Sequence, residues 1–203
     1  ANDAMLHAFS ADASDGGTEL WAFVPTKVMP SMYHLADSGY ATKHRFFVDG
    51  APVMGDVYIN GAWKTILVGG LGKGGNGYYA LDITDPTKAP TLLWEFTDTN
   101  MGLTFGNPVI TKRKDGTWVV AFTSGYNNAD GQGHLYVVDA AKGTRQVDIS
   151  TGVGTMRRQA QGFTWDATHV PRGKSGKYAA SGGGTDWTSR PAKPSAWASC
   201  ATW

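Results

Sequence analysis

One stretch of strands and turns occurs twice in this chain, and this repeat limits the folds that the chain can adopt. The first copy, residues 55–82, reads GDVYINGAWKTILVGGLGKGGNGYYALD. The second copy, residues 109–139, has the same order: a strand, a turn ending in glycine, a second strand, a polar loop and a third strand. Trp63 and Trp118 are 55 residues apart, as are Gly70 and Gly125. Short strands repeated with a period of roughly 40–50 residues or a little more are typical of β-propeller blades.

Turn signals and a second motif extend the repeat in both directions. Asn60-Gly61 lies between two strand patterns and predicts a two-residue type I′ hairpin, which needs positive φ at both positions. The motif Leu-Trp-x-Phe occurs at residues 20–23 and again at 93–96. We therefore predict an all-β fold, a partial β-propeller of about two and a half blades. Residues 1–24 would hold the last two strands of one blade, 45–98 a complete blade, and 105–150 most of a third, with 144–149 as its outer strand.

The segment between the first two blades, residues 25–44, contains two prolines and a Ser-Gly pair. These residues predict a long irregular connection, with one helical turn near residues 32–36. Long loops on a rigid scaffold often carry binding sites, although a solvated linker would have the same composition. Both interpretations remain open at this stage.

The last segment, residues 155–203, has a different character. Four isolated tryptophans stand among small polar residues, without a period of 2 or of 3.6, and we expect an irregular tail. Residues 156–160, MRRQA, would arise if codons for Asp-Ala-Ala-Pro-Ser were read one base out of phase. We therefore hypothesise a frameshift near Thr155. The alternative is a genuine surface extension.

Composition narrows the function classes. The net charge is +1, so electrostatics gives no indication of nucleic-acid binding, and no window resembles a membrane span. A single cysteine, Cys200, excludes an intrachain disulfide framework. The chain begins at Ala1 without an initiator Met or a signal-peptide pattern, and we expect it to be a piece of a longer protein.

Residues 70–75, GLGKGG, match the pattern G-x-G-x-x-G of dinucleotide sites. That motif presents backbone N–H groups at the start of a helix, whereas a strand pattern follows here. Gly74 also occupies the position where a phosphate-binding P-loop needs Ser or Thr after Lys73. We interpret the glycines as residues that let a surface loop turn sharply with positive φ.

Other polar clusters also favour structural roles. The loop at residues 127–133 contains several oxygen ligands, but it lacks the spacing of a calcium loop and favours an Asx turn. The same interpretation applies to Asp12, Ser14 and Asp15. His7 and His134 are expected at strand starts, without metal-ligand spacing. The sequence assigns no catalytic, cofactor-binding or metal-binding residue. The matched tryptophans are predicted to be buried between blades: Trp21, Trp63, Trp94 and Trp118.

Several runs together resemble one family, among them ELWAFVP, HRFFVDGAPVMGDVY, WKTILVGGLGKGGNGYYALDIT and SGYNNADGQGHLYVVDAA. They are similar to the C-terminal propeller of the type IV pilus tip-associated adhesin and assembly proteins, the PilY/PilC family. The resemblance covers residues 1–154 and implies quinoprotein-like blades without enzymatic activity. It also implies a role in pilus assembly and retraction, twitching motility, and attachment to host or abiotic surfaces.

The same resemblance implies minor pilins and other pilus tip components as partners. It places the parent protein at the cell surface or in the periplasm of a Gram-negative bacterium. Calcium is implied for the full-length family, but no stretch here matches the family's D-x-D-x-D loop, so no calcium ligand is named. The alternative is a fragment of a dehydrogenase dependent on pyrroloquinoline quinone (PQQ). Such an enzyme would need acidic calcium ligands and a base near the propeller axis.

Overall fold

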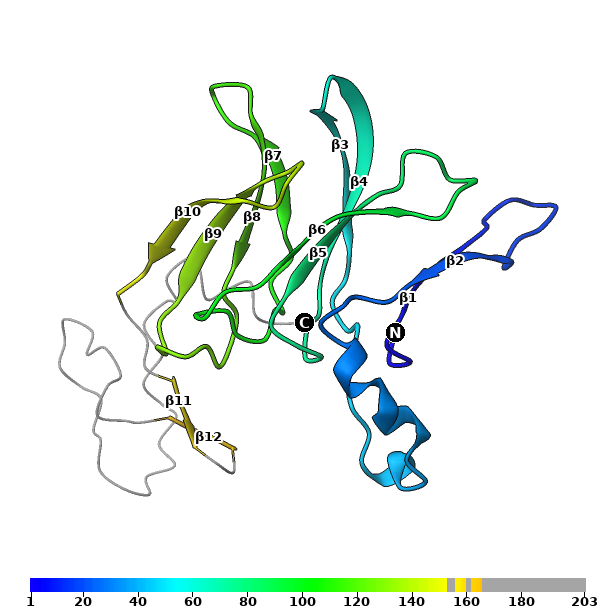
Figure 1. Cartoon of the computed structure of the whole chain (residues 1–203). Helices are drawn as coiled ribbons and strands as arrows, with labels where there is room; N and C mark the ends of the chain where they lie inside the picture. The colour runs from blue at the N-terminus through cyan, green and yellow to red at the C-terminus, as the bar shows by residue number, and fades with distance from the viewer. Residues whose placement is uncertain (153–155, 160–161, 166–203) are drawn as a thin grey trace, which may run out of the picture.

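The chain folds into antiparallel sheets that fan out as an arc (Figure 1). The computed structural model describes residues 1–152, 156–159 and 162–165. In this part of the chain the sheets form an open arc and not a closed ring, which confirms the predicted all-β partial propeller. No helix among these residues has the length and apolar character needed to cross a membrane.

Two four-stranded sheets form the centre of the arc. The first has the order β3-β4-β5-β6 and the second the order β7-β8-β9-β10, so that each strand pairs with the next along the chain. The first sheet consists of β3 (Val53–Ile59), β4 (Ala62–Gly70), β5 (Tyr78–Asp82) and β6 (Thr91–Phe96). The second consists of β7 (Val109–Lys112), β8 (Trp118–Thr123), β9 (His134–Asp139) and β10 (Arg145–Ser150).

The predicted hairpin turn is present between β3 and β4. Asn60 and Gly61 have φ angles of 53° and 77°, and Ile59 pairs with Ala62. Positive φ at both central residues is the signature of the type I′ turn, whose twist matches that of the flanking strands. The Asn-Gly signal was therefore sufficient to set the register of this hairpin.

An incomplete sheet and a helical connection precede the first full sheet. Strands β1 (Leu6–Phe9) and β2 (Glu19–Phe23) pair antiparallel. The connection contains two short 3-10 helices, η1 (Met29–Ala36) and η2 (Tyr40–Thr42). The helical turn expected at 32–36 begins earlier because Pro30 occupies the first turn of η1, where its fixed φ suits a helix start.

A second hairpin lies after the last predicted blade. Strands β11 (Met156–Gln159) and β12 (Gly162–Trp165) pair antiparallel within the segment that the sequence indicated to be irregular. Pairing across a short connection needs neither a repeat nor an apolar alternation, so sequence periodicity did not predict it. The remainder of this segment, Cys200 included, lies outside the described residues, and so does the residue at the hypothesised frameshift, Thr155.

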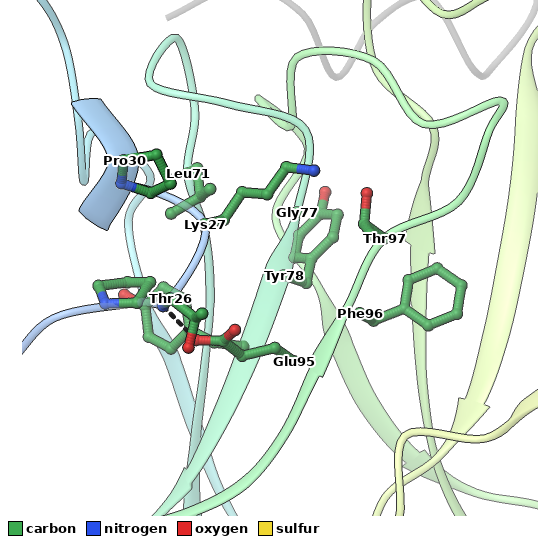
Figure 2. Close-up of a pocket in the computed structure, with 11 residues that line it drawn as sticks. Thr26, Lys27, Pro30, Leu71, Gly77, Tyr78, Glu95, Phe96 and Thr97 are labelled. Carbon is green, nitrogen blue, oxygen red and sulfur yellow. Dashed lines mark hydrogen bonds between the residues drawn. The ribbon is translucent and has the colours of Figure 1, made fainter.

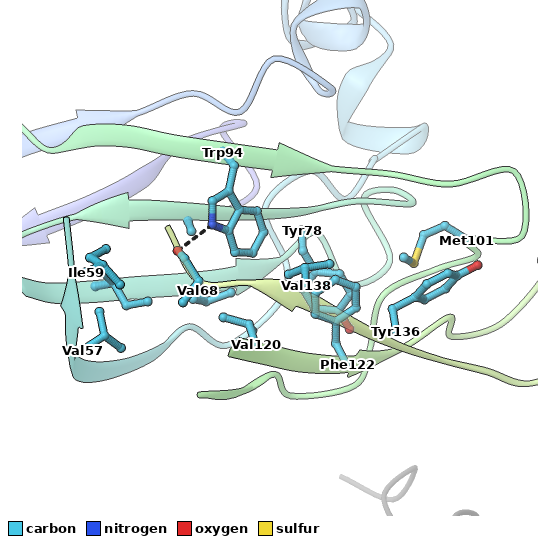
Figure 3. Packing of buried hydrophobic residues seen from close by; sticks show 13 residues of the cluster. Val57, Ile59, Val68, Tyr78, Trp94, Met101, Val120, Phe122, Tyr136 and Val138 are labelled. Atoms are coloured by element: carbon cyan, nitrogen blue, oxygen red, sulfur yellow. Dashed lines mark hydrogen bonds between the residues drawn. The ribbon is translucent and has the colours of Figure 1, made fainter. Parts of the chain in front are cut away.

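The larger hydrophobic core lies between the two four-stranded sheets (Figure 3). The Tyr78 ring of the first sheet stacks on the Phe122 ring of the second, with centroids 4.1 Å apart. Trp94 Nε1 donates a hydrogen bond of 2.9 Å to the Ala140 carbonyl oxygen. Each sheet therefore buries one face against its neighbour, as blades of a propeller do.

A second core joins the first hairpin and the connection to the opposite face of the first full sheet. Tyr79 and Leu81 of β5 are buried there beside Val28 of the connection and Phe47, which lies between the connection and β3. Tyr78 and Tyr79 are adjacent in the chain and, because side chains alternate along a strand, they enter different cores. Strand β5 is buried on both faces for this reason.

The tryptophan prediction was correct for one of the four residues. Trp94 is 5% exposed, but Trp63 is 62% exposed, and Trp21 and Trp118 are half-buried. Trp63 lies two residues after the hairpin turn, where the side chain projects past the core. It contacts Trp118 of the neighbouring sheet edge-on, with ring centroids 6.1 Å apart. The two matched rings therefore do contact each other across the two sheets, but Trp63 remains exposed to solvent.

Candidate functional site

The glycine-rich loop between β4 and β5 packs backbone against backbone on the segment that precedes β3. Asp49 N donates to the Leu71 carbonyl oxygen at 3.2 Å. A Cβ atom on Gly74 would overlap the carbonyl oxygen of Phe47, and one on Gly50 would overlap that of Gly70. Glycine is required at these positions because two main chains approach closely, and not because of the backbone angle.

The structure corrects the predicted surface position of this loop. Gly70, Leu71, Gly72 and Gly77 are buried, while Lys73 is exposed. Only Gly72 has positive φ, at 59°, among the glycines of this loop. Because glycine has no side chain, the backbone of the loop packs directly against the backbone of residues 47–50. The glycines of this loop therefore serve mainly close packing, and only Gly72 serves a turn with positive φ.

Thr104, which is 1% exposed, holds the loop from the side of the next sheet. Its hydroxyl oxygen accepts hydrogen bonds from Leu71 N at 2.9 Å and Gly72 N at 3.2 Å. The hydroxyl hydrogen is directed to the Gly77 carbonyl oxygen, 3.1 Å away. Two backbone donors of the loop are thus engaged by Thr104, and a strand and not a helix follows the loop, which argues against the phosphate cradle that the G-x-G-x-x-G pattern suggested.

A pocket of about 430 Å³ lies where this loop meets the connection. Figure 2 shows the Lys27 side chain extending from the connection toward β5, with Pro30 and Leu71 on one side and Tyr78 and Phe96 on the other. The wall is mainly apolar. A pocket of this size with few polar groups suits an apolar side chain or a small ligand.

Two tyrosines and one glutamate are among the polar residues of this pocket wall. Burial raises the pKa of Tyr78 far above its usual value and raises that of Tyr79 to about 12, so both hydroxyls stay protonated at neutral pH. Tyr78 donates to the Gly106 carbonyl oxygen at 2.8 Å. Glu95 Oε1 accepts a hydrogen bond of 2.7 Å from Thr26 N, which fixes the connection to β6 (Figure 2).

A second pocket of about 290 Å³ adjoins the first and shares Lys27 with it. It is basic, because Lys27, Arg45 and Lys73 all line it. Lys73 Nζ lies 4.3 Å from the centroid of the Phe46 ring, a cation–π contact that places the ammonium group. Within the described residues, the lysines and arginines that form ion pairs are different ones: Lys64, Lys88, Arg113 and Arg145.

The oxygen-rich loop at residues 127–133 contains the predicted Asx turn. Asp130 Oδ1 accepts hydrogen bonds from Gln132 N and from Asn128 Nδ2, both at 3.0 Å. The turn at Asp12 is of the same kind, since its Oδ1 accepts from Ser14 N at 2.8 Å. Within the described ranges no group of three or more His, Cys, Asp or Glu side chains is arranged to hold a metal ion.

His134 connects this loop to the outer strand of its sheet. The ring is buried between two carboxylates: Nε2 lies 2.8 Å from Asp130 Oδ2, and Nδ1 lies 2.9 Å from Asp148 Oδ1. Burial opposes the charge, but the hydrogen bonds to Asp148 and Asp130 outweigh it and raise the pKa of His134. The histidine is thus a packing residue at the start of β9, as predicted, and it is also the centre of an ion-pair cluster.

His7 is likewise in the first strand of the chain and bridges two carboxylates. Its ring nitrogens lie 2.7 Å from Glu19 Oε1 and 2.6 Å from Asp3 Oδ2. The hydrogen bonds to Glu19 and Asp3 raise its pKa. Both histidines therefore have a structural explanation.

The basic pocket was not predicted from the sequence as a site. The connection and the glycine-rich loop were each identified, but the pocket also needs residues 45–47, and Arg45 and Lys73 are 28 positions apart in the sequence. The sequence nevertheless contains a feature that could have indicated the basic pocket. Lys27, Arg45 and Lys73 each lie in a loop beside proline, aromatic or glycine residues and away from acidic neighbours.

Comparison with known proteins gives a consistent result. A family model described as the PilY1 beta-propeller domain matches residues 1–160. A Type IV pilus biogenesis factor PilY1 homolog of Xylella fastidiosa is 39% identical over 160 residues, covering 75% of this chain and 10% of the relative. The Type IV pilus biogenesis factor PilY1 of Pseudomonas aeruginosa is 37% identical over 160 residues, covering 76% of this chain and 13% of the relative.

A solved structure agrees with these sequence matches. The crystal structure of the Pseudomonas aeruginosa PilY1 C-terminal domain superposes with a TM-score of 0.62 and 35% sequence identity. The match covers 76% of this chain and 30% of the solved one. The chain thus spans only a small part of the curated relatives. Because the family match covers most of its residues and the solved domain shares its fold, the chain belongs to the PilY1 β-propeller domain family.

Proposed function

We propose that this chain is a propeller module of a type IV pilus biogenesis factor. The observation that carries the proposal is the similarity of residues 1–160 to the PilY1 propeller domain, combined with 37–39% identity to proteins named as type IV pilus biogenesis factors. The parent protein then acts outside the cytoplasm of a Gram-negative bacterium, at the cell surface or in the periplasm. Its partners are pilus components, including the minor pilins.

The proposed role is binding and assembly without catalysis. Two buried polar side chains support it, since both are engaged in structural contacts: Thr104 holds the glycine-rich loop and His134 bridges two carboxylates. In this role the blades contribute to pilus extension and retraction, and thereby to twitching motility and surface attachment. A calcium requirement is proposed for the full-length parent only.

An in-frame deletion tests the pilus role. Codons 45–150, which encode both complete sheets, are removed from the parent gene in its own bacterium. Surface pili are counted by electron microscopy, and twitching zones are measured on agar. We expect few or no pili, with recovery when the intact gene is supplied in trans. Normal piliation in the deletion strain would refute the pilus role.

An enzyme assay tests the absence of catalysis. The purified chain is incubated with pyrroloquinoline quinone, calcium and a panel of alcohols and sugars, and reduction of an artificial electron acceptor is followed. We expect the same rate as with heat-denatured chain. Acceptor reduction above that rate would favour the dehydrogenase alternative.

A further inference from the structure

We propose that the two pockets on either side of Lys27 form one binding site for an extended acidic peptide. The peptide would place a large apolar side chain in the 430 Å³ pocket and a neighbouring Asp or Glu in the 290 Å³ pocket. The inference concerns the chemistry of this surface and does not rest on the pilus role.

The first step of the argument is the contrast between the two pockets. The larger one is lined mainly by apolar and aromatic side chains, while the smaller one collects three cationic groups, Lys27, Arg45 and Lys73. Lys27 belongs to both, so that the two volumes adjoin at a single side chain. Side chains at every second residue of an extended strand lie on the same face, about 6.6 Å apart along its axis, which lets one peptide place side chains in both pockets.

The second step is charge complementarity. All three cations lack an ion-pair partner among the described residues, whereas Lys64, Lys88, Arg113 and Arg145 make five contacts to carboxylates there. Like charges gathered without a counter-ion repel one another, and an acidic ligand relieves that repulsion. The basic pocket is therefore complementary to a carboxylate.

The third step is that the site is preformed. Phe46 lies under the Lys73 ammonium group at 4.3 Å, and Gly74 packs on the Phe47 carbonyl oxygen. Val28 and Phe47 are buried and anchor both sides of the basic pocket. A ligand would not need to order the loop, so little of its binding free energy is lost.

The fourth step separates a peptide carboxylate from a phosphate. A phosphate loop binds through free backbone N–H groups. Here Gly72 N donates to Thr104 Oγ1 at 3.2 Å, and Gly74 N donates to the Leu71 carbonyl oxygen at 2.9 Å. These two N–H groups are engaged by other atoms of the chain, and the site offers side-chain cations beside an apolar pocket, which suits an acidic residue near a large apolar one.

Glu95 gives the proposed peptide a direction. Its carboxylate lies in the wall of the apolar pocket and is fixed by the hydrogen bond from Thr26 N at 2.7 Å. It repels an acidic group at that end. The acidic residue of the ligand is thus directed to the basic pocket.

The test uses the full 203-residue chain and a blocked, fluorescently labelled peptide, Gly-Ser-Phe-Asp-Glu-Gly-Ser. Binding is followed by fluorescence anisotropy. Two further peptides replace Phe by Ala, or Asp-Glu by Asn-Gln. We expect each replacement to weaken binding about tenfold or more, the effect of losing a charge-assisted contact or a buried apolar group.

Variants of the chain locate the binding. We expect Lys73→Met and Arg45→Gln each to weaken binding of the Phe-Asp-Glu peptide about tenfold. Lys114→Met is the matched control, because Lys114 is exposed in the turn between β7 and β8 and lines neither pocket. We expect that variant to bind as the natural chain does. Thermal melting confirms that all three variants remain folded.

Four results would overturn the proposal. The amide peptide could bind as tightly as the acidic one. Lys73→Met and Arg45→Gln could both leave the affinity for the peptide unchanged. Lys114→Met could weaken binding as much as they do, which would indicate unspecific electrostatic attraction. Inorganic phosphate at equal concentration could displace the peptide fully, which would make the basic pocket a site for small anions.

Discussion

The indole Nε1 of Trp94 donates a 2.9 Å hydrogen bond to the carbonyl oxygen of Ala140, and this contact joins the last strand of one sheet to the next sheet. Trp94 is 5% exposed, and the bond lies inside the core between the blades. We predict that Trp94→Phe lowers the free energy of unfolding by about 1–3 kcal/mol, because the buried carbonyl oxygen loses its partner. Urea unfolding followed by circular dichroism measures this change.

The matched control is Trp63→Phe. Trp63 is 62% exposed, and we expect its replacement to change the free energy of unfolding by less than about 0.5 kcal/mol. Equal losses in the two variants would contradict the assignment of Trp94, and not Trp63, to the core.

A second prediction separates the two reasons for glycine in this chain. Gly74→Ala places a Cβ atom on the Phe47 carbonyl oxygen, so the loop must move away from its partner, and we expect a loss of at least about 3 kcal/mol. Gly61→Ala meets no atom within 4 Å but keeps a φ of 77°, and we expect about 1–2 kcal/mol. Thermal and urea unfolding of both variants test this order. Gly61→Ala being the more damaging change would show that the loop is not packed as described.

A third prediction concerns pH and His134. Its folded pKa is raised above about 6.5, the value of an unfolded histidine, so protonated His134 stabilises the fold. That contribution is complete below the unfolded pKa and is lost as the pH rises through the folded pKa. We expect the stability difference between the natural chain and His134→Gln to shrink as the pH rises above about 6.5.

Asp148→Asn provides the control for this pH effect. Removing one of the two carboxylates lowers the folded pKa of His134, so the stability loss should be smaller and should end at a lower pH than in the natural chain. The neighbouring Arg145 Nη1, 2.7 Å from Asp98 Oδ2, keeps a partner in this variant. A stability difference that is constant across the whole range would contradict the ion-pair cluster.

A fourth prediction concerns the end of the chain. Within the part of the chain that the structure describes, every residue of the two hydrophobic cores lies between Ala4 and Ala141. We predict that a chain ending at Gly154 keeps the circular dichroism spectrum and melting temperature of the full chain. Unfolding of the blades on truncation would show that the later residues belong to the fold. Resequencing the gene tests the frameshift hypothesis separately, since it predicts a one-base insertion or deletion near the Thr155 codon.

Much of the fold could be predicted because the repeat and the turn signals agree. Asn60-Gly61 fixed the register of one hairpin, and the matched third strands fixed the order of the sheets. Burial was harder to predict. Trp63 and Trp94 are both matched aromatic residues of the repeat, but Trp63 is 62% exposed and Trp94 only 5%, a difference that the repeat does not encode.

The candidate site could be predicted only in part. The glycine-rich loop was identified, but its glycines were interpreted through φ, whereas Gly74 is needed for a close approach to Phe47. That approach joins segments that are distant in the sequence and have no shared pattern. The same long-range packing brings Arg45 beside Lys73, so the basic pocket had no local signature.

The most direct test of the pilus role disrupts the blades with a single substitution and measures whether pili still form. The parent gene in its own bacterium carries Gly74→Ala, with Gly61→Ala as the control, and surface pili are counted per cell. The account predicts that Gly74→Ala abolishes or sharply reduces piliation and that Gly61→Ala leaves most of it. Normal piliation with Gly74→Ala, in a protein whose purified blades unfold, would contradict the proposed function.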